Sequence, residues 1–376
     1  METTPRAEQA VVEAAVVAPD MAAGLDADWG KAGQGEAGRA QNLLTGQFAD
    51  AGDWRTLALI VVVYGGWGAL VFILPSYFLE YFPAFRGALL GALVLAPVLT
   101  LHSSLQHELL HGHPFRDQRF NDFLASVPVG LFIPYSRFKA THLRHHHDNN
   151  LCDPFDDPES WYRAPGEWAA RGRVFRWLLT ANNCLAGRLV LGPAIGVVGL
   201  IRHDFREGTE NGVWLPGQWL LHWVAAGAMA GLVAVYSGLP VWAYLVACYL
   251  AMSLLMVRTF AEHQSEIAEG AGLDGGPAER RGRSIIVEKG GIFAFLFLNN
   301  SLHQVHHAAP GLAWYRLPQR YRDNRERFQA MNKGYTVPGY RTLFARYMLR
   351  RKEPVLYPGA CHEPCEGGRE KSGRRG

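Results

Sequence analysis

Long uncharged runs of apolar residues constrain the fold of this chain more than any other feature. The four clearest runs lie at about 56–78, 87–105, 218–236 and 241–256. A helix rises about 1.5 Å per residue and the hydrocarbon core of a bilayer is about 30 Å thick, so runs of this length can cross it, although the fourth is marginal. One isolated run would suggest a buried core helix, but four runs in two pairs favour a membrane protein.

The connecting segments indicate two hairpins. Only 81–86 and 237–240 separate the runs of each pair, and these connectors carry almost no charge. Basic residues instead follow each pair, at Arg116, Arg119, Arg137, Lys139 and Arg144 and then at 280–283 and beyond Arg316. Because positive charge favours the cytoplasmic side, we expect these segments and both termini to be cytoplasmic. The sequence therefore predicts an all-α integral membrane bundle of about four transmembrane helices in two hairpins, with a cytoplasmic histidine-rich helical cap.

A fifth apolar stretch, at about 177–201, differs from the other four. It contains Asn182, Asn183 and Arg188 and has a middle rich in glycine and proline. An interfacial or re-entrant helix fits this pattern better than a membrane span.

The two ends of the chain differ in charge. Residues 1–53 are acidic and rich in alanine and glycine, which predicts a disordered segment, and 350–376 predict a basic flexible tail. A membrane domain is expected between them, at 54–349. Basic residues follow the membrane edges rather than one recognition face, so no nucleic-acid partner is expected and the lipid bilayer is the expected surface. Five scattered cysteines suggest no disulfide framework.

Histidines are clustered at spacings that suit metal binding. The clusters read His107-Glu-Leu-Leu-His111-Gly-His113, His142-Leu-Arg-His145-His146-His147 and His303-Gln-Val-His306-His307, and His263 stands alone. Positions i, i+3 and i+4 share one helix face. The candidate ligands are therefore His107, His111, His142, His145, His146, His263, His303, His306 and His307. Nine ligands exceed the needs of one four-coordinate zinc site, so we expect two metal ions.

Other polar residues near the clusters are candidates to support the ligands. His113 and His147 point away from the shared faces, whereas Asn299, four residues before His303, would lie on the ligand face and could hold a metal-bound water. Carboxylates that could orient imidazole N–H groups are Glu108, Asp148, Asp153, Asp156, Asp157, Glu159 and Glu262. His222, inside the third run, is expected to be a hydrogen-bonded bundle residue instead.

Ligand number bears on the choice of metal. Imidazole suits zinc, copper, iron and nickel alike. Nine neutral ligands shared by two octahedral ions would leave positions open for oxygen or water, whereas a structural zinc site is closed. The pattern therefore favours two iron ions at an oxygen-activating site.

The motifs H-x-x-x-H and twice H-x-x-H-H, around two hydrophobic hairpins, resemble those of the membrane fatty acid desaturase superfamily. That superfamily includes carotenoid ketolases and hydroxylases and alkane hydroxylases, and the resemblance covers about 54–349. It implies a four-span bundle with a cytoplasmic cap and a non-haem di-iron centre bound by histidines. It also implies O2-dependent oxidation of an unactivated C–H bond, here in a long-chain apolar substrate. By motif, the three boxes are His107 and His111; His142, His145 and His146; and His303, His306 and His307, with His263 as the extra histidine.

Departures from the family pattern concern the electron donor and the type of reaction. No H-P-G-G motif is present, so two electrons would come from a separate ferredoxin- or rubredoxin-like protein with its reductase. The third box begins with His303 rather than the glutamine of front-end desaturases, and the run 145–147 leaves the second box ambiguous, with the helical face favouring His145 and His146. His107-Glu-Leu-Leu-His111 and Glu262-His263 are similar to alkane hydroxylases, whereas Asp153-Pro-Phe-Asp-Asp-Pro is similar to carotenoid ketolases.

Desaturation of a fatty acyl lipid is the leading hypothesis, because it is the commonest activity that the resemblance implies. Hydroxylation or ketolation of a fatty acid, alkane or carotenoid is the alternative, since positioning differences of about 1 Å could decide between the two outcomes. A metal-ion transporter is a hypothesis of another class, which would require ligands at mid-membrane. Here the histidine clusters lie outside the apolar runs.

Overall fold

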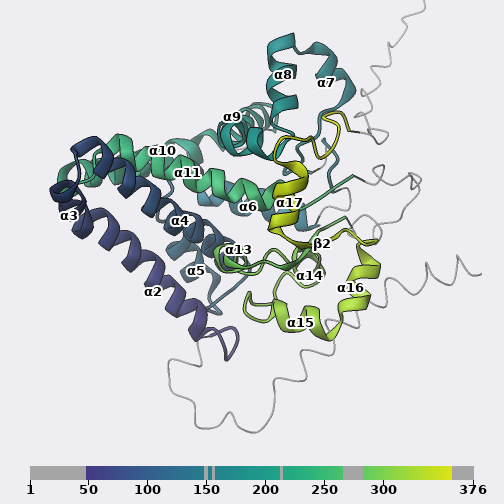
Figure 1. The fold of residues 1–376 in the computed structure, drawn as a ribbon, viewed down its shortest axis with the longest axis horizontal. Helices are drawn as coiled ribbons and strands as arrows, with labels where there is room; N and C mark the ends of the chain where they lie inside the picture. The colour runs from purple at the N-terminus through teal and green to yellow at the C-terminus, as the bar shows by residue number, and fades with distance from the viewer. Residues whose placement is uncertain (1–47, 148–150, 155–156, 212–214, 266–282, 358–376) are drawn as a thin grey trace, which may run out of the picture.

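The structure is a computed structural model that describes residues 48–147, 151–154, 157–211, 215–265 and 283–357. Almost all of the acidic segment expected at 1–53, and the part of the expected tail beyond 357, lie outside the described residues. The described chain is mostly helical, with one two-stranded sheet. Figure 1 shows the long helices on one side and a cap of short helices on the other.

Five helices are long and apolar enough to cross a membrane, judged by length and composition. They are α2 (Trp54–Gly68) with its π-helical continuation η3 (Ala69–Ile73), α4 (Ala84–Leu110), α9 (Leu185–Asn211), α10 (Leu215–Tyr236) and α11 (Val241–Thr259). A short helix, α3 (Leu74–Tyr81), connects η3 to α4. Four of the five correspond to the apolar runs, and α9 adds one candidate span to the number expected.

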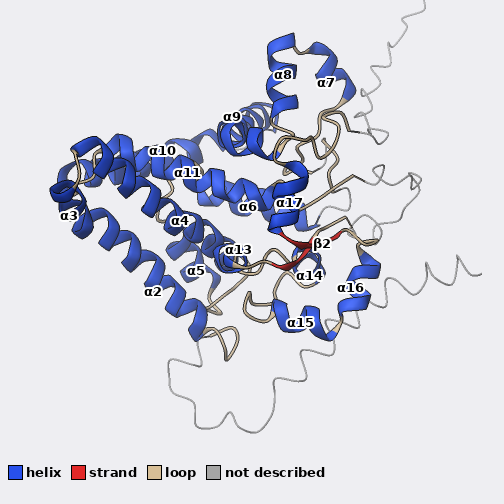
Figure 2. Ribbon diagram, viewed as in Figure 1, coloured by secondary structure: helices blue, strands red, loops and turns tan. Residues whose placement is uncertain are grey.

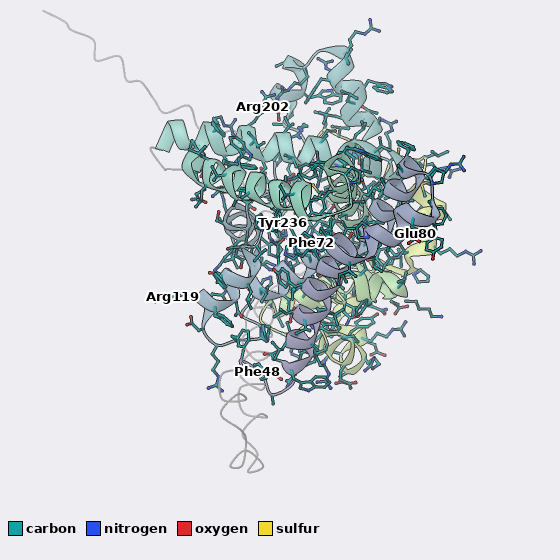
Figure 3. All side chains as sticks on the ribbon, turned by 90° about the vertical axis from the view of Figure 1, so that its left-hand side faces the viewer. Phe48, Phe72, Glu80, Arg119, Arg202 and Tyr236 are labelled. Carbon is teal, nitrogen blue, oxygen red and sulfur yellow. The ribbon has the colours of Figure 1, made fainter. Side chains whose placement is uncertain are left out.

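The two expected hairpins pack against each other through α4 and α11. Small buried residues of α4, including Ala88 and Ala92, share one apolar cluster with Ala243 and Ala247 of α11. Small side chains let helices approach closely, which strengthens packing where lipid offers no hydrophobic driving force. The outward faces of the bundle stay apolar and exposed, as lipid contact requires: Leu221 of α10, for example, is 72% exposed. Figure 3 views the bundle from the hairpin end, with Phe72 of η3 and Tyr236 of α10 labelled.

Helix α9 is oriented differently from the other long helices. Figure 1 shows it nearly end-on, whereas α2, α4 and α11 run across the view. It packs on α11, where Gly192 lies against Met256 and the Tyr249 hydroxyl donates to the Val190 carbonyl. The interfacial location expected for this segment remains a prediction, because length and composition also allow α9 to span.

A non-helical loop enters the bundle between α5 (Gln118–Ala125) and α6 (Tyr135–His147). Val129 and Leu131 of this loop are buried in the cluster shared by α4 and α11. Irregular backbone at this depth needs partners from the protein. The Tyr244 hydroxyl donates to the Val129 carbonyl at 2.7 Å, and His222 Nε2 lies 2.8 Å from the Leu131 carbonyl. His222 is therefore a hydrogen-bonded bundle residue, as the sequence predicts.

The cap is built from short helices and one small parallel sheet (Figure 2). Its elements are α7 (Pro165–Ala170), α8 (Arg173–Ala181), β1 (Ile286–Lys289), α13 (Ile292–Leu296), α14 (His303–Ala308), α15 (Leu317–Asp323), α16 (Arg325–Met331), β2 (Thr336–Gly339) and α17 (Tyr340–Tyr347). In the sheet, Ile286 pairs with Thr336 and Val287 with Val337. The cap joins the end of α11 through an apolar cluster that includes Val257, Val287 and Phe297.

The packed part of the chain extends beyond the boundary expected at 349. Arg351 forms a β-bridge with Cys184, and Leu356 forms one with Arg163. The Val355 side chain is buried. Partners from distant segments thus hold 351, 355 and 356, whereas the sequence predicts a basic flexible tail at 350–376.

Candidate metal centre

The nine predicted ligands come together as two groups, each with donor atoms within 4.8 Å of one another. The five-histidine group consists of His107, His111, His142, His146 and His306, and the four-histidine group of His145, His263, His303 and His307. The groups are adjacent, since the ring centroids of His146 and His307 are 4.5 Å apart. Both lie where α4 and α11 end against the cap.

Two short helices contribute to both groups. On α6, His142 and His146 belong to the five-histidine group and His145 to the four-histidine group. On α14, His303 and His307 belong to the four-histidine group and His306 to the other. The shared helix face predicted by the spacing therefore borders two sites rather than one.

Ring nitrogens within each group converge closely. In the four-histidine group, His263 Nε2 is 3.0 Å from the Nε2 atoms of both His145 and His303. In the five-histidine group, His146 Nε2 is 3.0 Å from the Nε2 atoms of both His142 and His306. Nitrogen ligands held about 2.1 Å from one ion and at right angles would be about 3.0 Å apart, whereas tetrahedral angles would separate them by about 3.4 Å.

Acceptors behind the rings determine which nitrogen faces the centre. His145 Nδ1 donates to Asp157 Oδ1 at 2.8 Å, and His142 Nδ1 donates to Glu159 Oε1 at 2.9 Å. His303 Nδ1 likewise donates to Asn300 Oδ1 at 2.9 Å. A neutral imidazole that donates through Nδ1 carries its lone pair on Nε2. In the neutral form of each of these three rings, the Nε2 atom that faces the histidine group is therefore an acceptor that can bind a cation.

Two other ring nitrogens have no protein partner. His107 Nε2 and His111 Nε2 are buried and make no hydrogen bond within the described residues. Buried polar atoms are rarely left unsatisfied, because each costs about 1–3 kcal/mol. Both atoms belong to the five-histidine group, so a metal ion is the partner that their arrangement fits.

Burial keeps most of these imidazoles neutral. It lowers the pKa values of His263, His306 and His307 well below the usual range, and neighbouring imidazoles lower them further. For His145 burial also lowers the pKa, but Asp157 and Glu159 outweigh it and raise the value to about 9. Asp157 at Nδ1 and Glu159, 4.0 Å from Nε2, thus favour positive charge at the four-histidine group.

Several residues expected to support the ligands lie elsewhere. His113 Nδ1 is 2.9 Å from Asp53 and its Nε2 is 3.0 Å from the Gly311 carbonyl, so it joins α2 to the cap. Glu108 accepts a hydrogen bond from the Trp314 backbone rather than from a ligand ring. Glu262 does approach the site, with Oε1 3.7 Å from His303 Nδ1 and 2.6 Å from Arg258 Nε.

The expected role of Asn299 is not supported. Helix α14 begins only at His303, and Asn299 lies in the preceding turn with a φ of 59°. Helical spacing therefore does not apply to Asn299, whose side chain donates to the Trp314 carbonyl. Sequence reasoning missed Asn300, the actual partner of the His303 ring, because only the turn geometry reveals it. Asp148, Asp156 and the His147 side chain lie outside the described residues.

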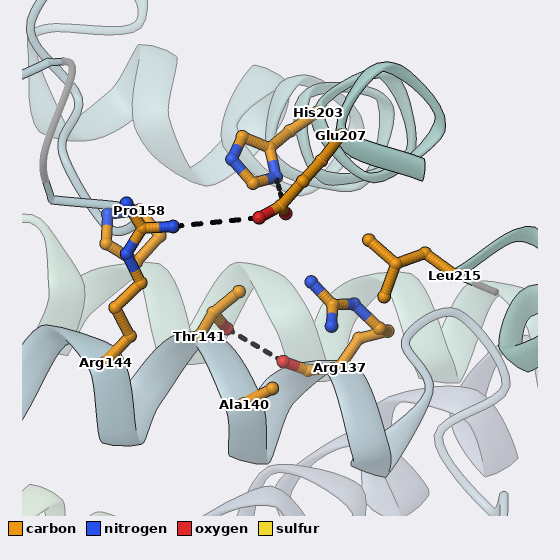
Figure 4. A pocket seen from close by; sticks show the side chains of 8 residues that line it. All are labelled: Arg137, Ala140, Thr141, Arg144, Pro158, His203, Glu207 and Leu215. Atoms are coloured by element: carbon orange, nitrogen blue, oxygen red, sulfur yellow. Dashed lines mark hydrogen bonds and ion pairs between the residues drawn. The ribbon is translucent and has the colours of Figure 1, made fainter. Parts of the chain in front are cut away.

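A small pocket of about 190 Å³ lies on another face of α6 (Figure 4). It is lined by Arg137, Ala140, Thr141, Arg144, Pro158, His203, Glu207 and Leu215. The side-chain donor atoms of a neighbouring group, His203, Asp204 and Glu207, lie within 4.8 Å of one another, close enough to hold a metal ion. However, Asp204 already accepts hydrogen bonds from Arg137, Trp219 and His203, so this group ties α6 to α9 and α10.

Fold and site together define a class of protein: a helical protein of the integral membrane type whose histidines could hold two metal ions. The model of the fatty acid desaturase family matches residues 83–339, which contain all nine of these histidines. The chain therefore belongs to the fatty acid desaturase family, and its class is that of a membrane desaturase-type oxidoreductase. No curated protein matches the chain.

Proposed function

We propose that this chain inserts a double bond into the acyl chain of a lipid, using O2 and two electrons from a separate donor protein. The observation that carries this proposal is the pair of adjacent all-histidine groups at one end of the apolar bundle. Family membership supports the reaction type. The proposed catalytic domain is 54–349, with 350–357 as part of its fold.

We propose two iron ions as the cofactor, one in each histidine group. Nε2 atoms of neighbouring imidazoles lie 3.0 Å apart, a spacing that suits an ion with more than four ligands. Nine such ligands therefore disfavour a closed, four-coordinate zinc site. Two octahedral ions would have more positions than nine ligands fill, leaving room for oxygen or water. When bound, the iron pair would supply the redox chemistry that O2-dependent attack on an unactivated C–H bond needs.

The residues around the site hold the ligands and exclude water. Asp157, Glu159 and Asn300 fix the ring orientations through Nδ1, so that each Nε2 is presented before a metal arrives. His145 and His303 are almost completely buried. Leu101, Leu105 and Leu109 of α4 form an apolar cluster next to the His107 turn. A long apolar chain entering from the bilayer would find similar surroundings there.

Hydroxylation or ketolation of a fatty acid, alkane or carotenoid would use the same metal groups. These reactions and desaturation diverge only after the first hydrogen has been removed, so product identification separates them. A metal-ion transporter is disfavoured by the location of the ligands. His107 and His111 lie at the end of α4, His263 follows α11, and the others are on α6 and α14, which are not candidate spans.

We further propose that the chain is a multi-pass membrane protein with its histidine groups and both termini in the cytoplasm. Exposed basic residues of the cap, such as Arg322, Arg341 and Arg346, support this orientation. The donor would be a ferredoxin- or rubredoxin-like protein with its reductase, since electrons must reach the cap from outside the bundle.

The test compares lipids, hydrocarbons and pigments, by mass spectrometry, from cells that express the wild-type chain, His306→Ala or neither. An acyl chain two hydrogens lighter, only with the wild type, supports the proposal. A new alcohol or ketone would replace desaturation by the alternative. Purified wild type should retain about two irons per chain, and readily exchanged zinc in their place would refute the oxidoreductase assignment.

A further inference from the structure

His263 is the ligand whose position the helices explain least. Eight of the nine predicted ligands lie on α4, α6 or α14 or directly cap α4. His263 instead follows α11 and forms an isolated β-bridge with Ser284. Within the described residues, its ring has one support outside the histidine group, the Ser284 hydroxyl 3.2 Å from Nδ1. The bridge holds the backbone through the Glu262 carbonyl and the Gln264 N–H, which leaves the His263 carbonyl to another partner.

A buried lysine from the C-terminal stretch contacts that backbone directly. Lys352 Nζ donates to the His263 carbonyl. The Lys352 and Glu353 side chains are only 9% and 8% exposed and form an ion pair at 2.8 Å. The Ser265 backbone N–H is shared between two acceptors, Glu353 Oε2 at 3.3 Å and the Tyr162 hydroxyl at 3.0 Å. The pair thus contacts the chain directly after His263 Cα, at the His263 carbonyl and at the Ser265 amide.

The pair is itself anchored to the turn between α8 and α9. The Lys352 backbone donates to the Asn183 carbonyl at 3.0 Å, and Asn183 Nδ2 donates to the Glu353 carbonyl at 2.6 Å. Burying an ion pair has a large desolvation cost, and replacement by apolar residues is often neutral or stabilising. The Lys352–Glu353 pair is held by Asn183 and contacts the segment that carries His263. This arrangement indicates that the pair positions His263 and does not serve stability alone.

We propose that Lys352 and Glu353 are positioning residues for His263, and that they determine how tightly the four-histidine group holds its metal ion. The inference rests on the proposed function for the identity of the metal. The five-histidine group contains no ligand from the His263 segment, so it should not depend on the pair. The expected consequence is a selective weakening of one of the two sites.

The test uses Lys352→Met, which keeps length and removes the donor, and Lys352→Met/Glu353→Gln, which leaves no unpaired buried charge. Hydrogen exchange should become at least about 10-fold faster at the Gln264 and Ser265 amides, as the His263 segment loosens, and remain unchanged in α6 and α14. Supporting groups around metal ligands change affinity by about 10–100-fold. Half of the bound iron should therefore be released to a chelator at least about 10-fold faster, with the other half released at the wild-type rate.

Lys289→Met, at an exposed lysine on β1, is the matched control and should change neither measurement. Lys352→Arg, which restores a donor, should recover most of the slow iron release. Unchanged exchange at Gln264 and Ser265 in Lys352→Met and in the double variant would overturn the inference. Equal acceleration of release for both irons would also overturn it, because that pattern indicates general destabilisation. Failure of the wild type to retain iron would instead refute the proposed function, while hydrogen exchange would still decide whether Lys352 positions the His263 segment.

Discussion

Replacement of Asp157 by Asn is expected to weaken metal binding at the four-histidine group. The Asp157 carboxylate is buried and accepts three hydrogen bonds. Oδ1 accepts from His145 Nδ1 at 2.8 Å and from the Glu159 backbone at 2.9 Å, and Oδ2 accepts from the Cys152 backbone at 2.8 Å. Every neighbour is therefore a donor, and asparagine can offer only one acceptor oxygen.

The cost follows from the two orientations open to the amide. If the asparagine oxygen replaces Oδ1, the amide NH₂ faces the Cys152 N–H, and a buried donor without a partner costs about 1–3 kcal/mol. If the amide is turned over, NH₂ faces His145 Nδ1 and favours the tautomer with a proton on Nε2, which cannot bind a metal. In either orientation, loss of the Asp157 negative charge weakens metal binding further. The expected loss of affinity is about 10–100-fold, or about 1.4–2.8 kcal/mol.

The assay is chelator competition on purified protein in detergent, with metal per chain measured by mass spectrometry. Asp157→Asn should weaken the four-histidine site. Glu159→Gln should weaken the five-histidine site more than the other, because Glu159 Oε1 is 2.9 Å from His142 Nδ1 but Glu159 Oε2 is 4.0 Å from His145 Nε2. Asp323→Asn, at an exposed carboxylate on α15, is the control. Wild-type affinity at both sites in Asp157→Asn would refute the reasoning.

Two further substitutions separate structural residues from ligands. Arg137→Met should lower the free energy of unfolding by about 3–5 kcal/mol, because it leaves buried Asp204 without its 2.7 Å ion pair. Arg144→Met should lower it by at most about 1 kcal/mol, because the Arg144 side chain is 51% exposed and 4.0 Å from Glu207. Denaturant titration of the detergent-solubilised protein would measure both, and equal losses would contradict the burial argument. His113→Ala should lower stability and retain both irons, whereas His111→Ala should lose iron, since only His111 belongs to a histidine group. Comparable iron loss in the two variants, measured as metal per chain, would restore His113 as a ligand candidate.

Hydropathy located the long helices because a span must be apolar along its whole length and satisfy its own backbone hydrogen bonds. It was less informative for α9, where Arg188 weighed against a span. In the structure Arg188 is buried, with its guanidinium 3.7 Å from the Trp161 ring centroid. That partner lies in a different segment, and local composition does not reveal it. Lys352 and Val355 were assigned to a flexible tail for the same reason, since their partners precede them by many residues.

The clustering of the nine histidines was predictable because helical periodicity operates over four residues, whereas the residues behind the rings depend on turns. Asp157 and Glu159 were among the acidic candidates, but nothing in the sequence distinguished them from Glu108, which faces away from the ligands. Asn299 was expected on the ligand face, yet positive φ angles at Leu298 and Asn299 end any helix before His303. Asparagine adopts a left-handed backbone more often than most residues, but Leu298 beside it gives no local signal of one.

The division of histidines between the two groups follows one spacing rule that the sequence already contains. At 3.6 residues per turn, side chains at i and i+4 differ by about 40° around a helix, and those at i and i+3 differ by about 60° in the opposite sense. Each i, i+4 pair should therefore face one ion, and the i+3 histidine between them should face its neighbour. All three helices obey this rule, with the pairs 107/111, 142/146 and 303/307 each within one group and His145 and His306 in the other. An H-x-x-H-H helix is thus suited to lie between two adjacent ions, whereas an H-x-x-x-H helix is suited to face one ion. The spacing of each motif therefore predicts how many ions its helix would contact.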